Sequence, residues 1–285
     1  MDVQDRISLP ADRLFGYTAW DAKHGEALLV FRGTLDPDWS ADGAFKNIVT
    51  DLDATQVKFF EHEAVLVHEG FFRGYEKMRT AVLAAVRKLR AAHKDAPLVL
   101  SGHSLGAALA TVAAADFAMN HKVENLRLVT FGSPRVFNKK GAQTVTNALL
   151  TKVWRVVNRH DPVPHMPLCT KGGCNEAGNG KTGFPGFLHD VISTVSGWIT
   201  GGTSFWHVAK EVWQPDGCST YHACDSAKAY KLCDMTGEDP TCSDSVTPDH
   251  YDPNDHVNGY CGIRPEGLLD DKVVCPKAMM TAPDR

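Results

Sequence analysis

Short apolar runs alternate along the chain with longer segments in which apolar residues recur every third or fourth position. Each short run, bounded by polar residues or glycine, predicts a buried strand. The longer segments predict helices with an apolar face. The expected strands cover residues 27–31, 97–100, 126–131 and 153–157, and the expected helices cover residues 70–93, 107–119 and 139–150.

This alternation predicts an α/β fold, with a mostly parallel sheet flanked by helices on both faces. The pattern decays after residue 161, where Gly-rich and Cys-rich sequence replaces it. We find no internal repeat and no clear linker in the sequence. We therefore expect one domain over residues 1–285, with a disulfide-rich C-terminal extension from about residue 217.

The composition is that of an ordinary globular protein, with 43% hydrophobic and 22% charged residues. The formal net charge of −4 gives no electrostatic reason to expect nucleic acid as a partner. The sequence has no apolar run of the roughly 18 residues that a membrane-spanning helix needs. No motif predicts a cofactor or a metal ion.

All eight cysteines lie at or after position 169. An even number in a loop-like stretch predicts disulfides and therefore an oxidising compartment. No C-x₂-C pair is present, which argues against a zinc site. The pairing stays open, sequential pairing being the simplest choice. Residues 1–9 lack the apolar segment of a signal peptide, so we expect a secreted protein whose signal peptide is not part of this chain.

Residues 102–106 (GHSLG) fit the pattern G-x-S-x-G. An expected strand precedes them and an Ala-rich expected helix follows, which is the context of a sharp turn that exposes the serine. The glycines are needed because a side chain at either position would collide with a neighbouring strand or helix. We expect Ser104 to be a nucleophile that attacks a carboxylic ester after a base has taken its proton.

A nucleophile of this kind requires an acid and then a base later in the chain. Asp161 follows the expected strand 153–157, at the carboxyl edge of the sheet where α/β proteins place catalytic groups. An Asp before a Pro also forms turns, but its position one strand and one helix after the turn at Ser104 favours the acid. The backbone N–H of Leu105 is one expected oxyanion donor, and the turn at residues 32–34 is expected to supply another.

The base is one of thirteen histidines, and two in the C-terminal tail are the candidates. Four others are set aside because of an expected side-chain direction, closeness to Asp161, or an expected strand or helix: His103, His160, His165 and His207. We favour His256, since the following Asn258 and Gly259 permit a sharp loop back to the sheet. His250 remains the alternative, although the prolines around it favour an extended chain.

With these residues in place, the chain resembles the fungal-type class 3 lipases, a branch of the α/β-hydrolase fold. The resemblance covers roughly residues 15–168, and the remainder more loosely. It lies in six ordered blocks: FRGT at 31–34, NIVTDL at 47–52, VHEGF at 67–71, GHSLG at 102–106, FGSPRV at 131–136 and VNRHDPVP at 157–164. It implies that Thr34 is an oxyanion residue and Asp161 the acid. Residues 205–208 and 211–213 resemble a late pair of strands, which makes His207 structural.

The chain also departs from the pattern of that family. The family usually has Asn-Trp where this chain has Asn47-Ile48, and the insert after Thr34 is longer than usual. We expect the lid over residues 35–50. The first strands of the family are expected to be missing or abbreviated, because FRGT arrives so early in the chain.

The function implied is hydrolysis of acylglycerols at a lipid–water interface, without stable membrane insertion. The apolar residues of the expected lid and of segment 187–206 would meet lipid, although 187–206 is equally compatible with a core helix and loop. One alternative is a soluble-ester or feruloyl-type esterase on the same scaffold, which the polar lid residues favour. A second alternative is a catalytically inactive binding protein.

Overall fold

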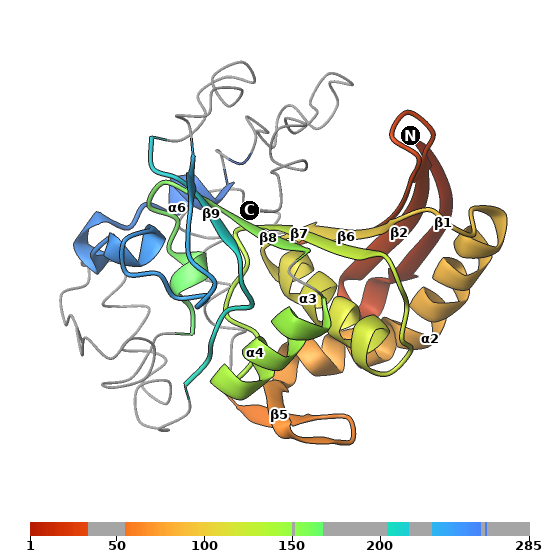
Figure 1. Ribbon diagram of the computed structural model, residues 1–285, viewed down its shortest axis with the longest axis horizontal. Coiled ribbons are helices and arrows are strands. Elements are labelled where there is room, and N and C mark those ends of the chain that lie inside the picture. Colours follow the sequence, from red (N-terminus) through yellow and green to blue (C-terminus); the bar gives the residue numbers. More distant parts are fainter. Residues whose placement is uncertain (34–54, 150–151, 168–203, 217–229, 258–259, 261–285) are drawn as a thin grey trace.

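The computed structural model describes residues 1–33, 55–149, 152–167, 204–216, 230–257 and 260 (Figure 1). These residues build a mixed eight-stranded sheet in the order β1-β2-β3-β6-β7-β8-β9-β10. The four pairings from β3 to β9 are parallel, and the pairings at the two ends of the sheet are antiparallel. The predicted α/β class and the mostly parallel sheet are therefore confirmed.

The central elements lie where the apolar pattern predicted them. The strands are β3 (Glu26–Phe31), β6 (Leu98–His103), β7 (Leu126–Phe131) and β8 (Val153–Asn158), and the helices are α2 (Glu69–Ala92), α3 (Leu105–Met119) and α4 (Lys139–Ala148). In α2, the apolar positions spaced three or four apart form the buried face. Leu29, Leu100 and Leu128 from three neighbouring strands are fully buried in the core.

The three long helices lie on one side of the sheet (Figure 1). The expectation of helices on both faces is wrong for the described part of the chain. The reason lies in the strand order, since β3, β6, β7 and β8 follow one another across the sheet in a single direction. Right-handed crossovers that advance in one direction place every connecting helix on the same face.

Two full strands precede β3, contrary to the expectation that the first strands are missing or abbreviated. They are β1 (Asp2–Leu9) and β2 (Leu14–Asp21), which pair antiparallel. β1 is an edge strand and most of its side chains are exposed. It therefore needs no apolar run, and the hydrophobic pattern does not reveal it.

Helix α3 is buried on all sides except at Leu105 and Ala118. Its many alanines allow close packing against β6, β7 and the helices on either side. Its one buried carboxylate, Asp116, accepts hydrogen bonds from Tyr75 at 2.8 Å and from Arg79 at 2.7 Å. Burial raises the pKa of this carboxyl group, but the bonds from Arg79, Asn120 and Tyr75 outweigh it and lower the pKa. The helix that follows Ser104 is thereby held firmly.

A separate hairpin, β4 (Gln56–Phe59) and β5 (His62–His68), leads into α2. At the other end of the sheet, β9 (Glu211–Gln214) pairs with β8 and with the short β10 (Lys231–Leu232). Residues 211–213 thus form the predicted late strand. Residues 205–208 do not form a strand. Among them, Trp206 makes a single isolated β-bridge, to Phe137.

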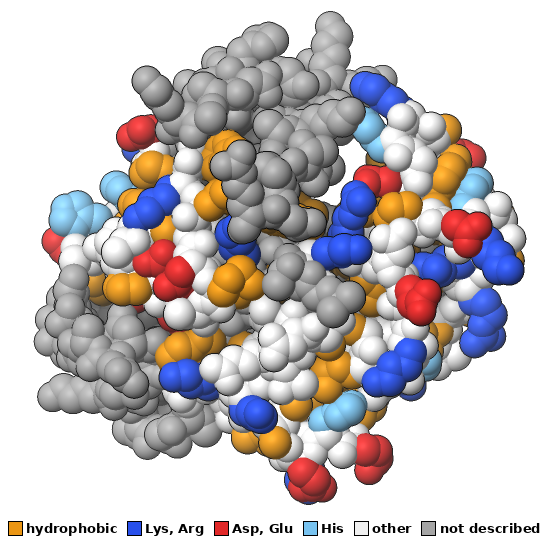
Figure 2. Space-filling view, viewed as in Figure 1, with side chains coloured by type: hydrophobic (Ala, Val, Ile, Leu, Met, Phe, Trp, Pro, Cys, Tyr) orange, Lys and Arg blue, Asp and Glu red, His pale blue; other side chains and the backbone are white. Residues whose placement is uncertain are grey.

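The described part of the tail after β10 folds against the carboxyl end of the sheet and includes the short helix α6 (Pro253–Val257) (Figure 1). Cys233 and Cys242 form a disulfide, which is one of the pairs expected from sequential pairing. The other six cysteines lie outside the described residues. The described helices include none that is long and apolar enough to cross a membrane. Figure 2 shows acidic and basic side chains interspersed over the described part of the visible surface.

Candidate active site

Ser104 lies in the turn between β6 and α3, with backbone angles φ 56° and ψ −126°. This conformation is rare for a residue with a side chain and is held by its surroundings. The Ser104 N–H donates to the Phe131 carbonyl at 3.0 Å, which ties the turn to the end of β7. A Cβ atom at Gly102 would lie 2.3 Å from the Gly106 carbonyl oxygen, and one at Gly106 would lie 2.3 Å from that of Phe31. Both glycines are therefore required for the predicted steric reason.

Asp161 is fully buried just after β8, close to the end of β7. Its Oδ1 accepts the Val163 N–H at 2.8 Å, which is the turn-forming bond expected of an Asp before a Pro. Its Oδ2 faces His256 Nδ1 at 2.9 Å and accepts a hydrogen bond from the Tyr260 hydroxyl. The two oxygens have separate partners, so the turn-forming interpretation does not exclude the interpretation as an acid.

The ionised form of Asp161 is stabilised despite its burial. Burial by itself raises the pKa of this carboxyl group, but the charge and hydrogen bond of His256, with the bonds from Tyr260 and Val163, lower the pKa below its ordinary value. The Tyr260 hydroxyl is held protonated, because burial and then the Asp161 charge raise its pKa well above 10.0. A carboxylate only accepts hydrogen bonds, so His256 must carry its proton on Nδ1.

His256 lies in α6, with its side chain 2% exposed. Its Nε2 atom and the Ser104 Oγ are both buried, and neither has a hydrogen-bond partner among the described residues. His256 packs beside Gly132, where a Cβ atom would lie 2.9 Å from its Cε1 and 2.9 Å from Asp161 Oδ2. Only glycine fits there, and its φ of 55° suits glycine as well.

His250 lies elsewhere, with its side chain 65% exposed. Its Nδ1 shares a hydrogen bond with the Thr247 hydroxyl at 2.8 Å and lies 3.3 Å from a carboxylate oxygen of neighbouring Asp249. The chain is not extended at His250 itself, since Pro248–His250 forms a 3₁₀ turn, η6, with extended backbone only at Thr247 and Tyr251 on either side. Proline fits the first position of such a turn, which is why the flanking prolines misled the expectation. The structure therefore joins His256, and not His250, to Asp161.

His103 was expected to point to the other side of the turn, and this is wrong. Its Nε2 lies 2.9 Å from the His256 carbonyl oxygen, and the two rings are 4.5 Å apart. Burial, with the nearby His256 charge, lowers the pKa of His103 to about 3, so the ring is neutral and donates from Nε2. The residue beside the nucleophile thus supports the helix that carries His256.

The expected oxyanion donors are only partly described. Leu105 is the first residue of α3, where backbone N–H groups have no acceptor within the helix and the helix dipole favours negative charge. Thr34 lies outside the described residues, as do the expected lid and residues 187–203 of segment 187–206. Its neighbour Gly33 is described, and a Cβ atom there would lie 3.6 Å from Ser104 Cβ. The end of β3 therefore approaches the nucleophile.

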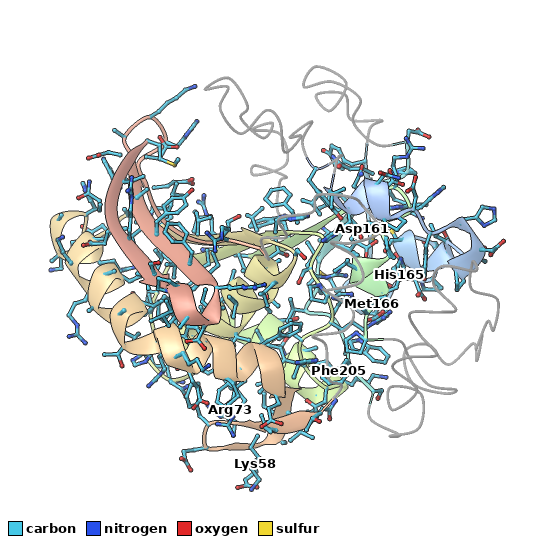
Figure 3. All side chains as sticks on the ribbon, turned by 180° about the vertical axis from the view of Figure 1, so that it is seen from behind. Lys58, Arg73, Asp161, His165, Met166 and Phe205 are labelled. Carbon is cyan, nitrogen blue, oxygen red and sulfur yellow. A yellow bond between two sulfur atoms is a disulfide. The ribbon has the colours of Figure 1, made fainter. Side chains whose placement is uncertain are left out.

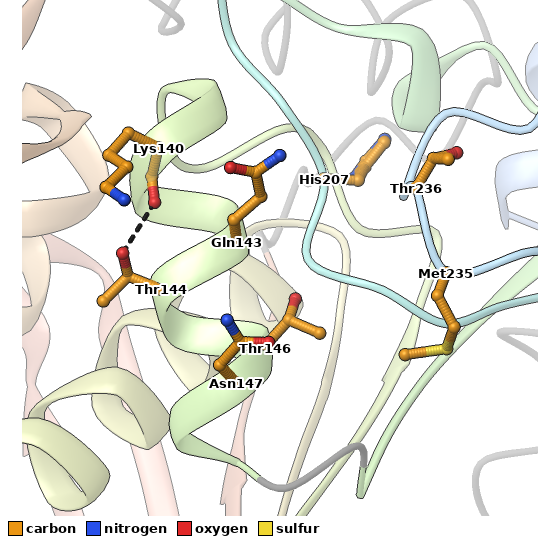
Figure 4. Close-up of a pocket in the computed structure, with 8 residues that line it drawn as sticks. All are labelled: Lys140, Gln143, Thr144, Thr146, Asn147, His207, Met235 and Thr236. Atoms are coloured by element: carbon orange, nitrogen blue, oxygen red, sulfur yellow. Dashed lines mark hydrogen bonds between the residues drawn. The ribbon is translucent and has the colours of Figure 1, made fainter.

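Two residues of this site, Tyr260 and Gly132, had no role assigned from sequence. Tyr260 directly follows Asn258 and Gly259, which had favoured His256, and Gly132 lies in the block FGSPRV at 131–136. A separate polar pocket of about 190 Å³ lies between α4 and the segment that carries Met235 and Thr236 (Figure 4). Ser104, Asp161 and His256 do not line this pocket, so it is not the site described above.

A parallel sheet with a serine on a strained turn after a central strand, and an Asp–His pair at the same edge, defines the α/β-hydrolase class. Comparison with protein families gives the narrower assignment. The model of the family "Lipase (class 3)" matches residues 28–171, and the chain belongs to this family.

Two fungal lipases are similar to part of the chain. The lipase of Rhizopus niveus is 29% identical over 207 residues, which are 72% of this chain and 46% of that protein. The secreted mono- and diacylglycerol lipase 2 of Gibberella zeae is 35% identical over 121 residues, 39% of this chain and 30% of that protein. The chain thus spans no more than about half the length of the relatives that it matches. The structure of lipase II from Rhizopus niveus superposes with a TM-score of 0.68 at 24% identity, covering 92% of this chain and 80% of that one, and supports the fold alone.

Three buried histidines near the site make stability dependent on pH. Burial lowers the pKa of His103 and His165 to about 3, and lowers that of His207 well below 6.5. In the unfolded chain these rings take up protons near pH 6.5, so acid favours unfolding. We expect full stability above pH 6.5 and a loss on acidification, at up to about 1.4 kcal/mol per pH unit for each histidine. Urea denaturation between pH 7 and pH 5 measures this slope.

His165→Gln should flatten that slope, because it removes one of the three rings. His250→Gln is the matched control, since its ring is exposed and its loss should leave the slope unchanged. A free energy of unfolding that does not vary between pH 7 and pH 5 would contradict the assignment of these rings as neutral and buried.

Proposed function

We propose that the protein is a serine esterase of the lipase type, which hydrolyses acylglycerols through an acyl-enzyme on Ser104. The observation that carries the proposal is the 2.9 Å contact between His256 Nδ1 and Asp161 Oδ2, beside a strained serine turn. It leaves His256 Nε2 to act as the base. We further propose that the domain is single, as the continuous sheet from β1 to β10 supports.

In the first half of the reaction, His256 Nε2 takes the proton of Ser104 Oγ as that oxygen attacks the ester carbonyl. The oxyanion of the tetrahedral intermediate accepts a hydrogen bond from the Leu105 N–H, and we propose Thr34 as the second donor. His256 then gives its proton to the leaving alcohol, and the acyl group stays on Ser104. Asp161 keeps the imidazole in the tautomer that this transfer requires.

In the second half, a water molecule gives a proton to His256 Nε2 and attacks the acyl carbonyl. The intermediate collapses to a carboxylic acid, and Ser104 recovers its proton. The class of substrate is supported by the names of the relatives, which are lipases and mono- and diacylglycerol lipases. Secretion is supported by the Cys233–Cys242 disulfide and by the relatives described as secreted.

Ser104→Ala should lower kcat by about 10⁴-fold or more, since only binding and oxyanion stabilisation remain. Ser101→Ala is the matched control, because Ser101 lies in β6 three residues earlier and should keep nearly full activity. Rates of ester hydrolysis and circular dichroism of both variants provide the comparison. A Ser104→Ala variant that retains more than about a tenth of the activity would exclude this nucleophile.

His256→Ala and His250→Ala, made separately, should differ in kcat by about 10³-fold or more. The first removes the partner of Asp161, whereas the second removes an exposed ring. Single-turnover kinetics with a p-nitrophenyl ester measure the effect on acylation. Small and equal losses would show that neither histidine is the base.

Emulsified long-chain triacylglycerols should be hydrolysed faster than short soluble esters once the substrate exceeds its solubility limit. The physical reason is that an interface offers the acyl chains at high local concentration to an apolar site. A series of triacylglycerols, p-nitrophenyl esters and methyl ferulate compares the classes directly. Activity confined to soluble esters or to the ferulate would replace the lipase proposal by the esterase alternative, and leave the proposed residues in place.

A further inference from the structure

Arg135 and Glu238 form a buried ion pair between the end of β7 and the C-terminal tail. Their side chains are 3% and 2% exposed. The pair is bidentate, with Arg135 Nε donating to Oε1 at 2.9 Å and Nη2 donating to Oε2 at 2.8 Å. A buried pair of this kind adds little net stability compared with apolar residues, but removing one partner is strongly unfavourable. Stability alone therefore does not explain why this ion pair is present.

The third nitrogen of Arg135 holds the turn that begins at Asp161. Nη1 donates to the carbonyl oxygens of His165 and Pro167, and the Arg135 backbone N–H donates to the Met166 carbonyl at 2.7 Å. Figure 3 shows Asp161, His165 and Met166 together at the edge of the sheet. The near end of this turn is fixed by the bond from Val163 to Asp161. Arg135 fixes its far end.

Glu238 reaches the same turn by a second route. Its Oε1 accepts the backbone N–H of His207 at 3.0 Å. The His207 ring, neutral because burial lowers its pKa, donates from Nε2 to the Pro164 carbonyl at 2.6 Å. One carboxylate thus binds both residues that hold 164–167, through the guanidinium of Arg135 and the backbone of His207.

The Cys233–Cys242 disulfide closes the loop that carries Glu238. Inside the loop, the Glu238 N–H donates to the Thr236 hydroxyl at 3.2 Å, and Gly237 presents its carbonyl to Arg155 at 3.0 Å. A closed loop has few conformations, so the carboxylate is delivered to one place. No local pattern indicates this role, because Glu238 lies 77 positions after Asp161 in a tail without periodicity.

We infer that Glu238, acting through Arg135 and His207, is a positioning residue for Asp161. Since Asp161 orients His256, the inference rests on the proposed function of that pair. Without the Glu238 charge, buried Arg135 loses its bidentate partner and keeps only the more distant carboxylate of Asp244, at 4.0 Å. Arg135 and His207 then no longer share the carboxylate that places them against residues 163–167. The hydrogen bond between Asp161 and His256 then loosens. The acylation step suffers, whereas the surface that binds the substrate is unchanged.

Glu238→Gln tests this inference, with Glu211→Gln as its matched control. Glu211 forms the neighbouring buried pair with Arg155 at 3.0 Å, but neither residue bonds to the turn after Asp161. We expect Glu238→Gln to lower kcat by about 10- to 100-fold with little change in KM, on the scale of a small misplacement of reacting groups. Glu211→Gln should lower the melting temperature similarly and keep kcat near the wild-type value. All rates are taken well below each melting temperature.

Two further variants separate positioning from stability. Glu238→Asp keeps the charge and should recover part of the lost kcat. The double variant Arg135→Met/Glu238→Leu replaces the pair by apolar side chains and should recover stability, but not kcat. If the double variant regains both stability and kcat, or if Glu211→Gln loses as much kcat as Glu238→Gln, the pair is structural only and the inference is overturned.

A readout without substrate keeps this inference separate from the proposed function. The His256 Nδ1 proton shared with Asp161 should give a far-downfield ¹H NMR signal, absent in His256→Ala. We expect the signal to broaden or move upfield in Glu238→Gln and to stay in place in Glu211→Gln. An unchanged signal in Glu238→Gln contradicts positioning, whatever the activity. A wild-type protein that shows the signal but hydrolyses no ester contradicts the proposed function instead.

Discussion

The carboxylate of Asp161 is charged and has no access to water. A buried charge is tolerated only where hydrogen bonds and opposite charge replace its hydration. Its three donors come from the adjacent turn, from α6 and from Tyr260, so distant parts of the chain must converge on two oxygen atoms. The tail is therefore part of the site and not an appendage to it. The disulfide loop and the Arg135–Glu238 pair hold the same turn from outside.

The central part of the fold could be predicted from sequence because its signals are local. Each parallel strand is an apolar run and each helix has its own periodicity, as α2 shows. β1 could not be predicted, since an edge strand is exposed and shows no such run. The side on which the helices pack was also missed, because it depends on the order of strands in space, which no local pattern contains.

The same distinction applies to the candidate site. Ser104, Leu105 and Asp161 lie next to strand ends, and the sequence could place them there by counting elements. The tail has no periodicity, so the choice between His256 and His250 depended on local turn residues and stayed open. Only the fold shows that His256 contacts Asp161 at 2.9 Å while His250 is exposed. The direction of the His103 ring was missed for a similar reason, because its partner lies 153 positions later in the chain.

We propose that Ser104 is activated by the pair of His256 and Asp161. The most direct measurement is the reaction of the folded protein with a fluorophosphonate, followed by mass spectrometry of its peptides. We expect a single phosphonyl adduct, on the peptide that contains Ser104, and a labelling rate at least about 10³-fold lower in His256→Ala. Labelling at another serine would contradict the assignment of Ser104, and a folded protein that stays unlabelled would favour a binding protein on the same scaffold.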